Sequence, residues 1–311
     1  MDPFPNRMST TSTFALIFVL LAAGVVLARS RLLPVGTADA LVKLALCVLL
    51  PASILRYVPR LEISVNLAGL VVVPWLICAV GVPIALLARR WLVLDRGATA
   101  CVLLGGTLGN TAYLGYALVP ALLGVDALGY AVVFDQFGSF IALATFGLYA
   151  IAWFSGGERP SLLATFRRVL QFPPTIALLF ALTAMPAQPW PLAGTLLDGL
   201  ASALLPCVVI AVGMQLRFRL RRDQAAPLLV IVVAKLVLMP ALAWVLASML
   251  GLSIELRDVA VLQAGMPTMI TTAALLALAG LAPELSAAMV GYTTVLSMLS
   301  LPLWHWLLSM A

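Results

Sequence analysis

The sequence predicts an all-α integral membrane protein in which ten transmembrane helices form two inverted five-helix repeats, with broken, crossing helices 4 and 9. Hydrophobic residues make up 63% of the 311 residues, charged residues only 10%, and the mean hydropathy is +1.13. An average soluble domain has about 25% charged residues. The apolar residues fall into separate runs close to the roughly 20 residues that a membrane-spanning helix needs, and the two halves of the chain resemble each other.

Ten apolar runs define the expected helices. They lie near residues 12–28, 38–58, 65–88, 98–121, 128–154, 172–187, 192–215, 225–250, 258–281 and 286–308, of which the first and the sixth are short. Arg29 and Arg31 follow the first run and only Arg7 precedes it. This arrangement predicts an uncleaved first helix whose N-terminus lies outside, rather than a signal peptide.

The basic residues predict the orientation of the chain. One side would carry Arg7, Arg56, Arg60 and Arg257, and the other would carry Arg29, Arg31, Arg89, Arg90, Arg96, Arg159, Arg167, Arg168, Arg217, Arg219, Arg221 and Arg222. Because Lys and Arg accumulate in cytoplasmic loops, the second side is expected to be cytoplasmic and both termini outside. The net charge of +6 then reflects membrane topology and not nucleic-acid binding. We expect a multi-pass protein of a cell membrane, the bacterial inner membrane.

Three short matches in the same order indicate an internal repeat. They are Leu-Leu-Pro ending at Pro51 and at Pro206, Val-Leu at 102–103 and at 261–262, and Gly-Tyr at 129–130 and at 291–292. Five helices are an odd number, so the second copy must enter the membrane inverted. The expected divisions are a first repeat over residues 1–154, a cytoplasmic linker over 155–171 and a second repeat over 172–311.

Two segments in matching positions are interrupted by glycine, proline and polar residues. They read LLGGTLGNTAYLGYALVP over 103–120 and LQAGMPTMITTAALLALAG over 262–280. Irregular backbone at membrane depth is tolerated only where it is buried in protein or lines a watery cavity. Paired broken helices in inverted repeats indicate the binding site of a secondary transporter. Counted from their opposite ends at about 1.5 Å per residue, Asn110 would lie roughly 18 Å and Pro267 roughly 14 Å deep, so the two interruptions are expected to meet.

These interruptions supply the predicted substrate-binding residues, which are Gly109, Asn110, Thr111, Gln263, Pro267 and Thr268. A break frees backbone N–H groups at the positive start of a half-helix, where a carboxylate is favoured. The Asn and Thr side chains could cap the half-helix or donate to an anion. Alternatively, glycine and proline only kink packed helices. Gln263, like Gln136, could bind substrate or hold a half-helix, and the sequence leaves this choice open.

Two ionisable residues lie near the middle of predicted helices, and such residues are functional hypotheses. Asp135 could carry a coupling ion, and Lys235 could attract an anionic substrate. The alternative for both is a structural ion pair between them. The sequence contains one His and four scattered Cys and no metal-ligand cluster. We therefore expect no metal site and no cofactor, with H⁺ or Na⁺ as the possible coupling ion.

Two blocks, LGNTAYLGYALVPALLGVDALGYAVVFDQFGSF and QAGMPTMITTAALLALAGLAPELSAAMVGYTTVLSMLSLPLW, resemble the auxin efflux carrier family in its bacterial branch. The resemblance extends over the whole chain. It implies a fold shared with bile-acid/sodium symporters, in which a panel domain accompanies a core domain. It also implies transport of organic anions such as auxin-like acids, malonate or malate. The long hydrophilic central loop of plant members is absent from this sequence, so regulation through such a loop is not expected.

The expected function is therefore secondary active transport of a small organic anion, a mono- or dicarboxylate, by elevator-type movement of the core domain against the panel domain. An intramembrane enzyme is one alternative, although the sequence has no HExxH, no GxSxG and no paired acidic motif. A passive anion channel is the other. The expected partners are the substrate and the lipid bilayer, with a homodimer possible, and the sequence determines neither the substrate nor the direction of transport.

Overall fold

The computed structural model describes residues 10–30, 32–34, 36–61, 66–157 and 161–311. Every regular element in these ranges is a helix, so the prediction of an all-helical protein is confirmed. Arg7, Arg31 and Arg159, which the orientation prediction uses, lie outside the described residues.

The first half consists of α-helices and of short π-helical or 3₁₀ turns. They are α1 (Thr10–Ser30), α2 (Thr37–Leu44), η1 (Ala45–Leu49), α3 (Leu50–Tyr57), η2 (Val58–Arg60), α4 (Asn66–Leu92), α5 (Arg96–Thr107), α6 (Tyr113–Leu123), α7 (Ala127–Val133), η3 (Phe134–Ser139), α8 (Phe140–Ala142), η4 (Leu143–Gly147) and α9 (Leu148–Ser155). The elements from α7 to α9 follow one another without a gap and form a single long helix.

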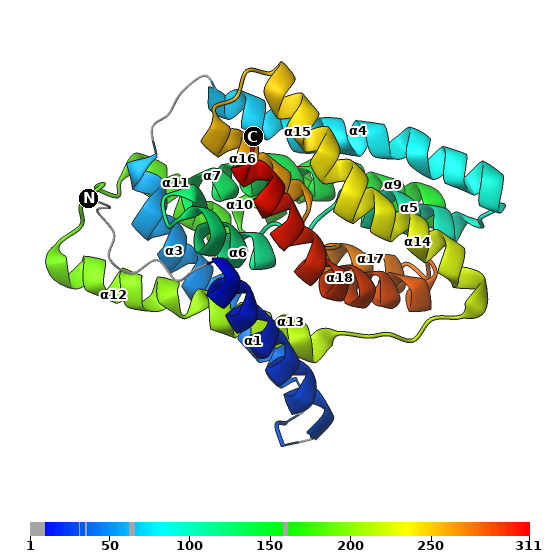
Figure 1. Cartoon of the computed structure of the whole chain (residues 1–311), viewed down its shortest axis with the longest axis horizontal. Helices are drawn as coiled ribbons and strands as arrows, with labels where there is room; N and C mark the ends of the chain where they lie inside the picture. Colours follow the sequence, from blue (N-terminus) through cyan, green and yellow to red (C-terminus); the bar gives the residue numbers. More distant parts are fainter. Residues whose placement is uncertain (1–9, 31, 35, 62–65, 158–160) are drawn as a thin grey trace.

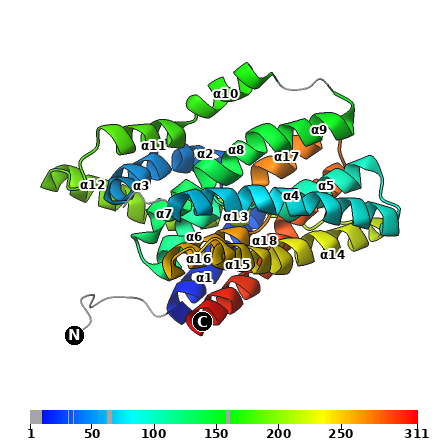
Figure 2. The same cartoon turned by 90° about the horizontal axis from the view of Figure 1, so that it is seen from above.

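The second half is built in the same way. Its helices are α10 (Leu162–Leu170), α11 (Pro173–Thr183), α12 (Pro191–Ser202), α13 (Leu204–Gln215), η5 (Arg222–Gln224), α14 (Ala225–Val233), η6 (Ala234–Leu238), α15 (Met239–Met249), α16 (Ile254–Ala264), α17 (Ile270–Leu278) and α18 (Pro283–Ser309). Helix α10 lies inside the segment 155–171 that the sequence predicts to be a linker. Figure 2 shows α10 at the periphery of the bundle.

Among the described residues, seven helical stretches are long and apolar enough to cross a membrane: Ser12–Ser30, Thr37–Arg60, Leu67–Leu92, Ala127–Ser155, Pro191–Gln215, Arg222–Met249 and Pro283–Ser309. They coincide with seven of the ten predicted runs. The other three runs, 98–121, 172–187 and 258–281, contain shorter helices. The chain is thus a multi-pass membrane protein, whereas the arrangement as ten spans stays a prediction.

The helices pack into two groups (Figure 1). In the first group, α1 and α2 pack against α13, and α3 packs against α11 and α12. In the second group, α4, α14 and α17 pack against α5, α15 packs against α4 and α16, and α17 packs against α18. This group also includes α6 and α7, which pack against each other and against α16. The groups meet where α13 contacts α6 and where α3 contacts α7. One buried apolar cluster spans this boundary, and another lies within the second group.

Small residues allow the closest helix contact in the first group. A Cβ atom added to Gly24 of α1 would lie 3.0 Å from the Cα of Gly213 in α13 and closer still to the carbonyl oxygen of Ile210. Only glycine at both positions lets the two backbones approach this closely, as in other membrane helix pairs.

Helices α3 and α12 are also joined by an ion pair. The guanidinium of Arg56 donates from Nε to Asp198 Oδ1 at 2.6 Å and from Nη2 to Oδ2 at 3.0 Å. This two-point geometry is the stronger form of an Arg–carboxylate pair. It adds a fixed polar contact to the apolar packing within the first group.

Candidate functional site

The two helix interruptions lie side by side and pair through their backbones. Gly109, between α5 and α6, forms an antiparallel β-bridge with Thr268, between α16 and α17. The N–H of Asn110 donates to the carbonyl of Pro267 at 2.7 Å, and the N–H of Met269 donates to that of Leu108 at 3.0 Å. Backbone groups that the helices leave unpaired therefore find partners in each other, as a buried interruption requires.

Asn110 caps the second half of its own segment. Its Oδ1 accepts from the backbone N–H of Tyr113 at 3.2 Å and lies 3.5 Å from that of Leu114. These donors belong to the first turn of α6, where an Asn oxygen is a preferred cap. The other side-chain atom, Nδ2, is buried and has no partner among the described residues. The residue thus holds the half-helix with one atom and leaves an amide donor free.

The second interruption is held by its neighbours. The hydroxyl of Thr268 donates to the carbonyl of Gly105 at 2.8 Å, and its backbone N–H donates to Thr293 Oγ1 at 3.0 Å. Gln263 Nε2 donates to the carbonyls of Ala131, at 3.1 Å, and Thr111, at 3.4 Å. The amide nitrogen of Gln263 therefore ties α16 to α7 and to the first interruption, while its Oε1 is buried without a partner in the described chain.

Lys235 brings a buried cation to the point where the interruptions meet. It lies in the π-helical turn η6, and such turns are frequent at functional sites. Only 1% of the side chain surface is exposed, and Nζ donates to the carbonyl of Ala264 at 2.5 Å. A Cβ at Gly109 would lie 2.9 Å from Nζ, so glycine is needed for the ammonium to approach this backbone. No carboxylate of the described residues forms an ion pair with it.

Asp135 lies in a different π-helical turn, η3, and is surrounded by donors. Thr111 Oγ1 donates to Oδ1 at 2.5 Å, and Tyr116 OH and Gln136 Nε2 donate to Oδ2 at 2.8 Å and 2.9 Å. Three donors suit an ionised carboxylate, which only accepts hydrogen bonds. Asp135 and Lys235, both described, do not form the ion pair that the sequence left as an alternative.

The hydrogen bonds of Asp135 continue into the first helix group. Gln136 Oε1 accepts from Thr175 Oγ1 of α11 at 2.8 Å. A buried polar chain thus runs from Thr111 at the first interruption through Asp135 and Gln136 to Thr175. Sequence reasoning did not identify Tyr116 or Thr175. Their only signal is a polar group within an apolar run, which is common in membrane helices and does not reveal a partner.

A small cavity lies between these groups. Its volume is about 10 Å³, and its lining includes Ile77, Thr107, Gly109, Thr111, Lys235 and Gln263. This is about the space that one water molecule requires. A carboxylate can therefore enter only if the surrounding elements move apart. Within the described residues, no group of three His, Cys, Asp or Glu side chains is placed to hold a metal ion.

Comparison with known sequences identifies the family of this helical membrane protein. Residues 9–154 and 158–305 match a family described as membrane transport protein, which is the auxin efflux carrier family. The chain belongs to this family, as the sequence predicts.

Two archaeal relatives carry names of the same kind. The chain is 28% identical over 304 residues to an uncharacterized transporter of Methanothermobacter thermautotrophicus, which covers 96% of this chain and 98% of the relative. It is 26% identical over 247 residues to an uncharacterized transporter of Methanocaldococcus jannaschii, with 76% and 78% covered. These relatives support a transporter without indicating its substrate.

Proposed function

We propose that the protein is a secondary active carrier of a small organic anion, a mono- or dicarboxylate of the size of malonate or malate or an auxin-like acid. The observation that carries this proposal is the ammonium of Lys235. It is buried beside Gly109, where the two interruptions pair, and it has no carboxylate partner in the described chain. An unpaired buried charge is costly. A bound carboxylate would neutralise it. Asn110, which follows Gly109 in the chain, has a buried Nδ2 without a partner in the described residues, and we propose this amide as a second contact.

The architecture proposed for this carrier has ten spans in two inverted repeats. Seven spans are the long apolar stretches given above. The remaining three would be α5 with α6, the short helix α11, and α16 with α17. The two interrupted spans would then cross in the membrane with the binding site between them. The two helix groups would correspond to panel and core, and transport would move the second group along the first in an elevator-type step.

The polar chain through Asp135 supports coupling between this movement and an ion. An ionised Asp135 accepts from three donors, and it fixes the Gln136 amide so that Oε1 faces Thr175 of the other helix group. Protonation would place a donor on Asp135 facing other donors and would disturb this contact. H⁺ is therefore the coupling ion that we propose, with Na⁺ as the alternative outcome of the test.

The test is uptake of a panel of radiolabelled carboxylates into proteoliposomes, with proton and sodium gradients imposed separately. A carrier accumulates at least one carboxylate above its external concentration, and only under the gradient of the coupling ion. Uptake that stops at equal concentrations under both gradients would indicate a channel. Recovery of a chemically altered product would indicate an enzyme.

We also propose that the protein lies in a cell membrane, the inner membrane of a bacterial cell, with both termini outside, because basic residues are concentrated in the loops of the other side. In intact cells, a cysteine introduced as Ser161→Cys should be protected from a membrane-impermeant thiol reagent, whereas one introduced as Ala187→Cys should react. The unmodified chain, with its four native cysteines, supplies the background. Labelling of the first and protection of the second would reverse the orientation.

A further inference from the structure

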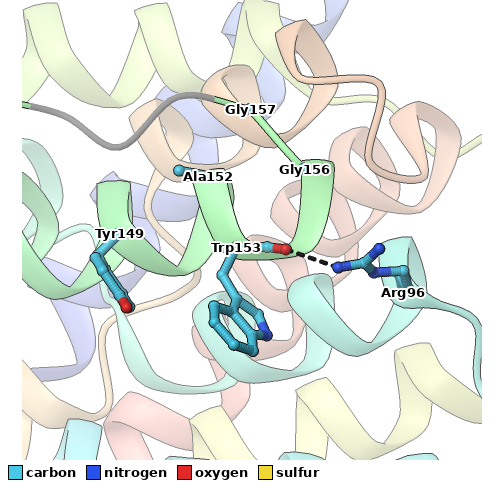
Figure 3. Close-up of a pocket in the computed structure, with 6 residues that line it drawn as sticks. All are labelled: Arg96, Tyr149, Ala152, Trp153, Gly156 and Gly157. Atoms are coloured by element: carbon cyan, nitrogen blue, oxygen red, sulfur yellow. Dashed lines mark hydrogen bonds between the residues drawn. The ribbon is translucent and has the colours of Figure 1, made fainter.

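A larger cavity lies away from the site described so far, between the start of α5 and the end of α9 (Figure 3). Its volume is about 260 Å³, and it is lined by Arg96, Tyr149, Ala152, Trp153, Gly156 and Gly157. This is many times the volume of the cavity beside Lys235. The cavity is thus large enough for a charged group of several heavy atoms.

Arg96 gives this cavity its charge. It lies in the first turn of α5, and its Nη2 donates to the carbonyl of Trp153 in the last turn of α9 at 2.8 Å (Figure 3). A guanidinium has five N–H donors. The others have no protein acceptor within the described part of the chain, so the side chain is held in place and still has donors to offer.

The surroundings of the cavity are those of a membrane–water interface. Tyr149 and Trp153 lie one turn apart on α9 with 45% and 59% of their surface exposed. Trp91, at the end of α4, is 72% exposed. Exposed aromatic side chains of this kind gather at the level of lipid headgroups. The cavity is therefore placed where headgroups, rather than acyl chains, are the nearest ligands.

The local charge is predominantly basic. Arg89 and Arg90 end α4 a few residues before Arg96, and all three are exposed. The nearest acidic residue in the described sequence, Asp95, is engaged, because its Oδ1 caps α5 by accepting from the Ala98 N–H at 2.6 Å. The distribution of arginines predicts that this end of the molecule faces the cytoplasm, where membrane surfaces are anionic.

We propose that this cavity binds the phosphate group of an anionic membrane lipid. The Arg96 guanidinium would contact the phosphate oxygens, for which its planar fork is well matched. Tyr149 and Trp153 would pack against the glycerol region of the lipid. A headgroup held here would join the start of α5, which leads into the first interruption, to the end of α9.

The test measures lipid retention by the purified full-length protein in detergent, by native mass spectrometry, with dioleoylphosphatidylglycerol against dioleoylphosphatidylcholine. The phosphatidylglycerol should be retained on the order of tenfold better, the size of effect that about 1.4 kcal/mol produces. Arg96→Gln should abolish the preference. Arg90→Gln, an exposed arginine of the same region that does not line the cavity, should keep it. Equal retention of both lipids by the parent protein, or an unchanged preference in Arg96→Gln, would overturn the proposal.

Two further measurements test whether the cavity itself binds the lipid and whether the bound phosphate belongs to a lipid. Ala152→Leu fills the cavity and leaves Arg96 in place, so it should also weaken phosphatidylglycerol retention, and circular dichroism verifies that each variant is folded. sn-Glycerol 3-phosphate and inorganic phosphate test the source of the phosphate. The lipid proposal predicts that neither displaces phosphatidylglycerol at equal concentration. If either displaces it fully, the cavity is a site for soluble phosphate anions and the lipid proposal is wrong.

Discussion

The two helix interruptions are paired with each other, yet they are stabilised in different ways. In the first, the Asn110 side chain caps the half-helix that follows, and the Thr111 hydroxyl donates a hydrogen bond to the buried carboxyl of Asp135. The second has no side-chain cap on α17, and neighbouring elements hold it through Thr268 and Gln263. The buried carboxyl of Asp135 accepts from Thr111 at the first interruption, whereas the buried amine of Lys235 donates to the carbonyl of Ala264, which ends α16 before the second.

This difference suggests a division of roles. The side of Asp135 is connected through Gln136 to the other helix group, so it is suited to couple an ion to movement. Lys235 forms no ion pair and no side-chain hydrogen bond to the other helix group within the described residues, so its amine is suited to attract the substrate. Substitutions at four positions test whether the roles are separate, in order of decreasing expected effect.

Replacement of Asp135 should have the largest effect. We expect Asp135→Asn to abolish gradient-driven accumulation, because an amide cannot take up and release the coupling proton, while exchange of labelled for unlabelled substrate persists. Both activities are measured in the same proteoliposomes. The control is Asp39→Asn, which changes an exposed carboxylate in the first turn of α2. Accumulation by Asp135→Asn at the parent level would reduce Asp135 to a structural role.

Replacement of Lys235 should affect binding instead of coupling. Lys235→Met removes the buried cation and keeps an unbranched apolar chain, so the Kd for the carboxylate should rise by on the order of a hundredfold. This corresponds to about 3 kcal/mol, within the range for removing one partner of a buried charge pair. Equilibrium binding of labelled substrate measures it, with the exposed Lys43→Met as control. In the described chain Lys235 donates only to the Ala264 carbonyl and pairs with no carboxylate, so the substrate-free protein should lose no more than about 1–3 kcal/mol of stability. A larger loss of thermal stability would indicate a structural role.

Asn110 should have a smaller effect on the same binding step. Loss of one hydrogen bond to a charged group costs about 1.5–3 kcal/mol, which is roughly tenfold to a hundredfold in Kd. Asn110→Ala loses both the cap and the donor, whereas Asn110→Asp keeps a capping oxygen, loses the amide donor and adds a carboxylate that would repel the anionic substrate. Both should bind more weakly than Asn66→Ala, a change at the first residue of α4. If Asn110→Asp binds substrate like the parent, the side chain is only a helix cap.

The smallest effect is expected at the contact between the helix groups. Thr175→Val removes the hydroxyl that donates to Gln136, and one neutral hydrogen bond is worth about 1 kcal/mol, or roughly fivefold in rate. We expect the rate of gradient-driven uptake and its pH profile to change while the Kd for substrate does not, and Thr175→Ser to restore both. A change in Kd that Thr175→Ser leaves uncorrected would place Thr175 in packing alone.

Much of the fold follows from properties that are local in the sequence. Hydropathy over about 20 residues decides whether a stretch spans a bilayer, so seven predicted runs match long apolar helices closely. Hydropathy alone does not give the helix bounds in the other three runs, which contain α11 and the two interrupted segments. The helices there are shorter than the apolar runs. The segment 155–171 reads as a linker because its charges interrupt the apolar pattern, although it contains α10.

The sequence by itself determined that this chain is a helical membrane transport protein and which stretches are long and apolar enough to span a membrane, because hydropathy is carried by neighbouring residues. Only the tertiary structure decided that Gly109 pairs with Thr268, that Asp135 and Lys235 remain apart, and that Gln136 reaches Thr175. These contacts join helices far apart in the chain. Their presence depends on how the helices cross and rotate against each other, which the periodicity of any single helix does not specify.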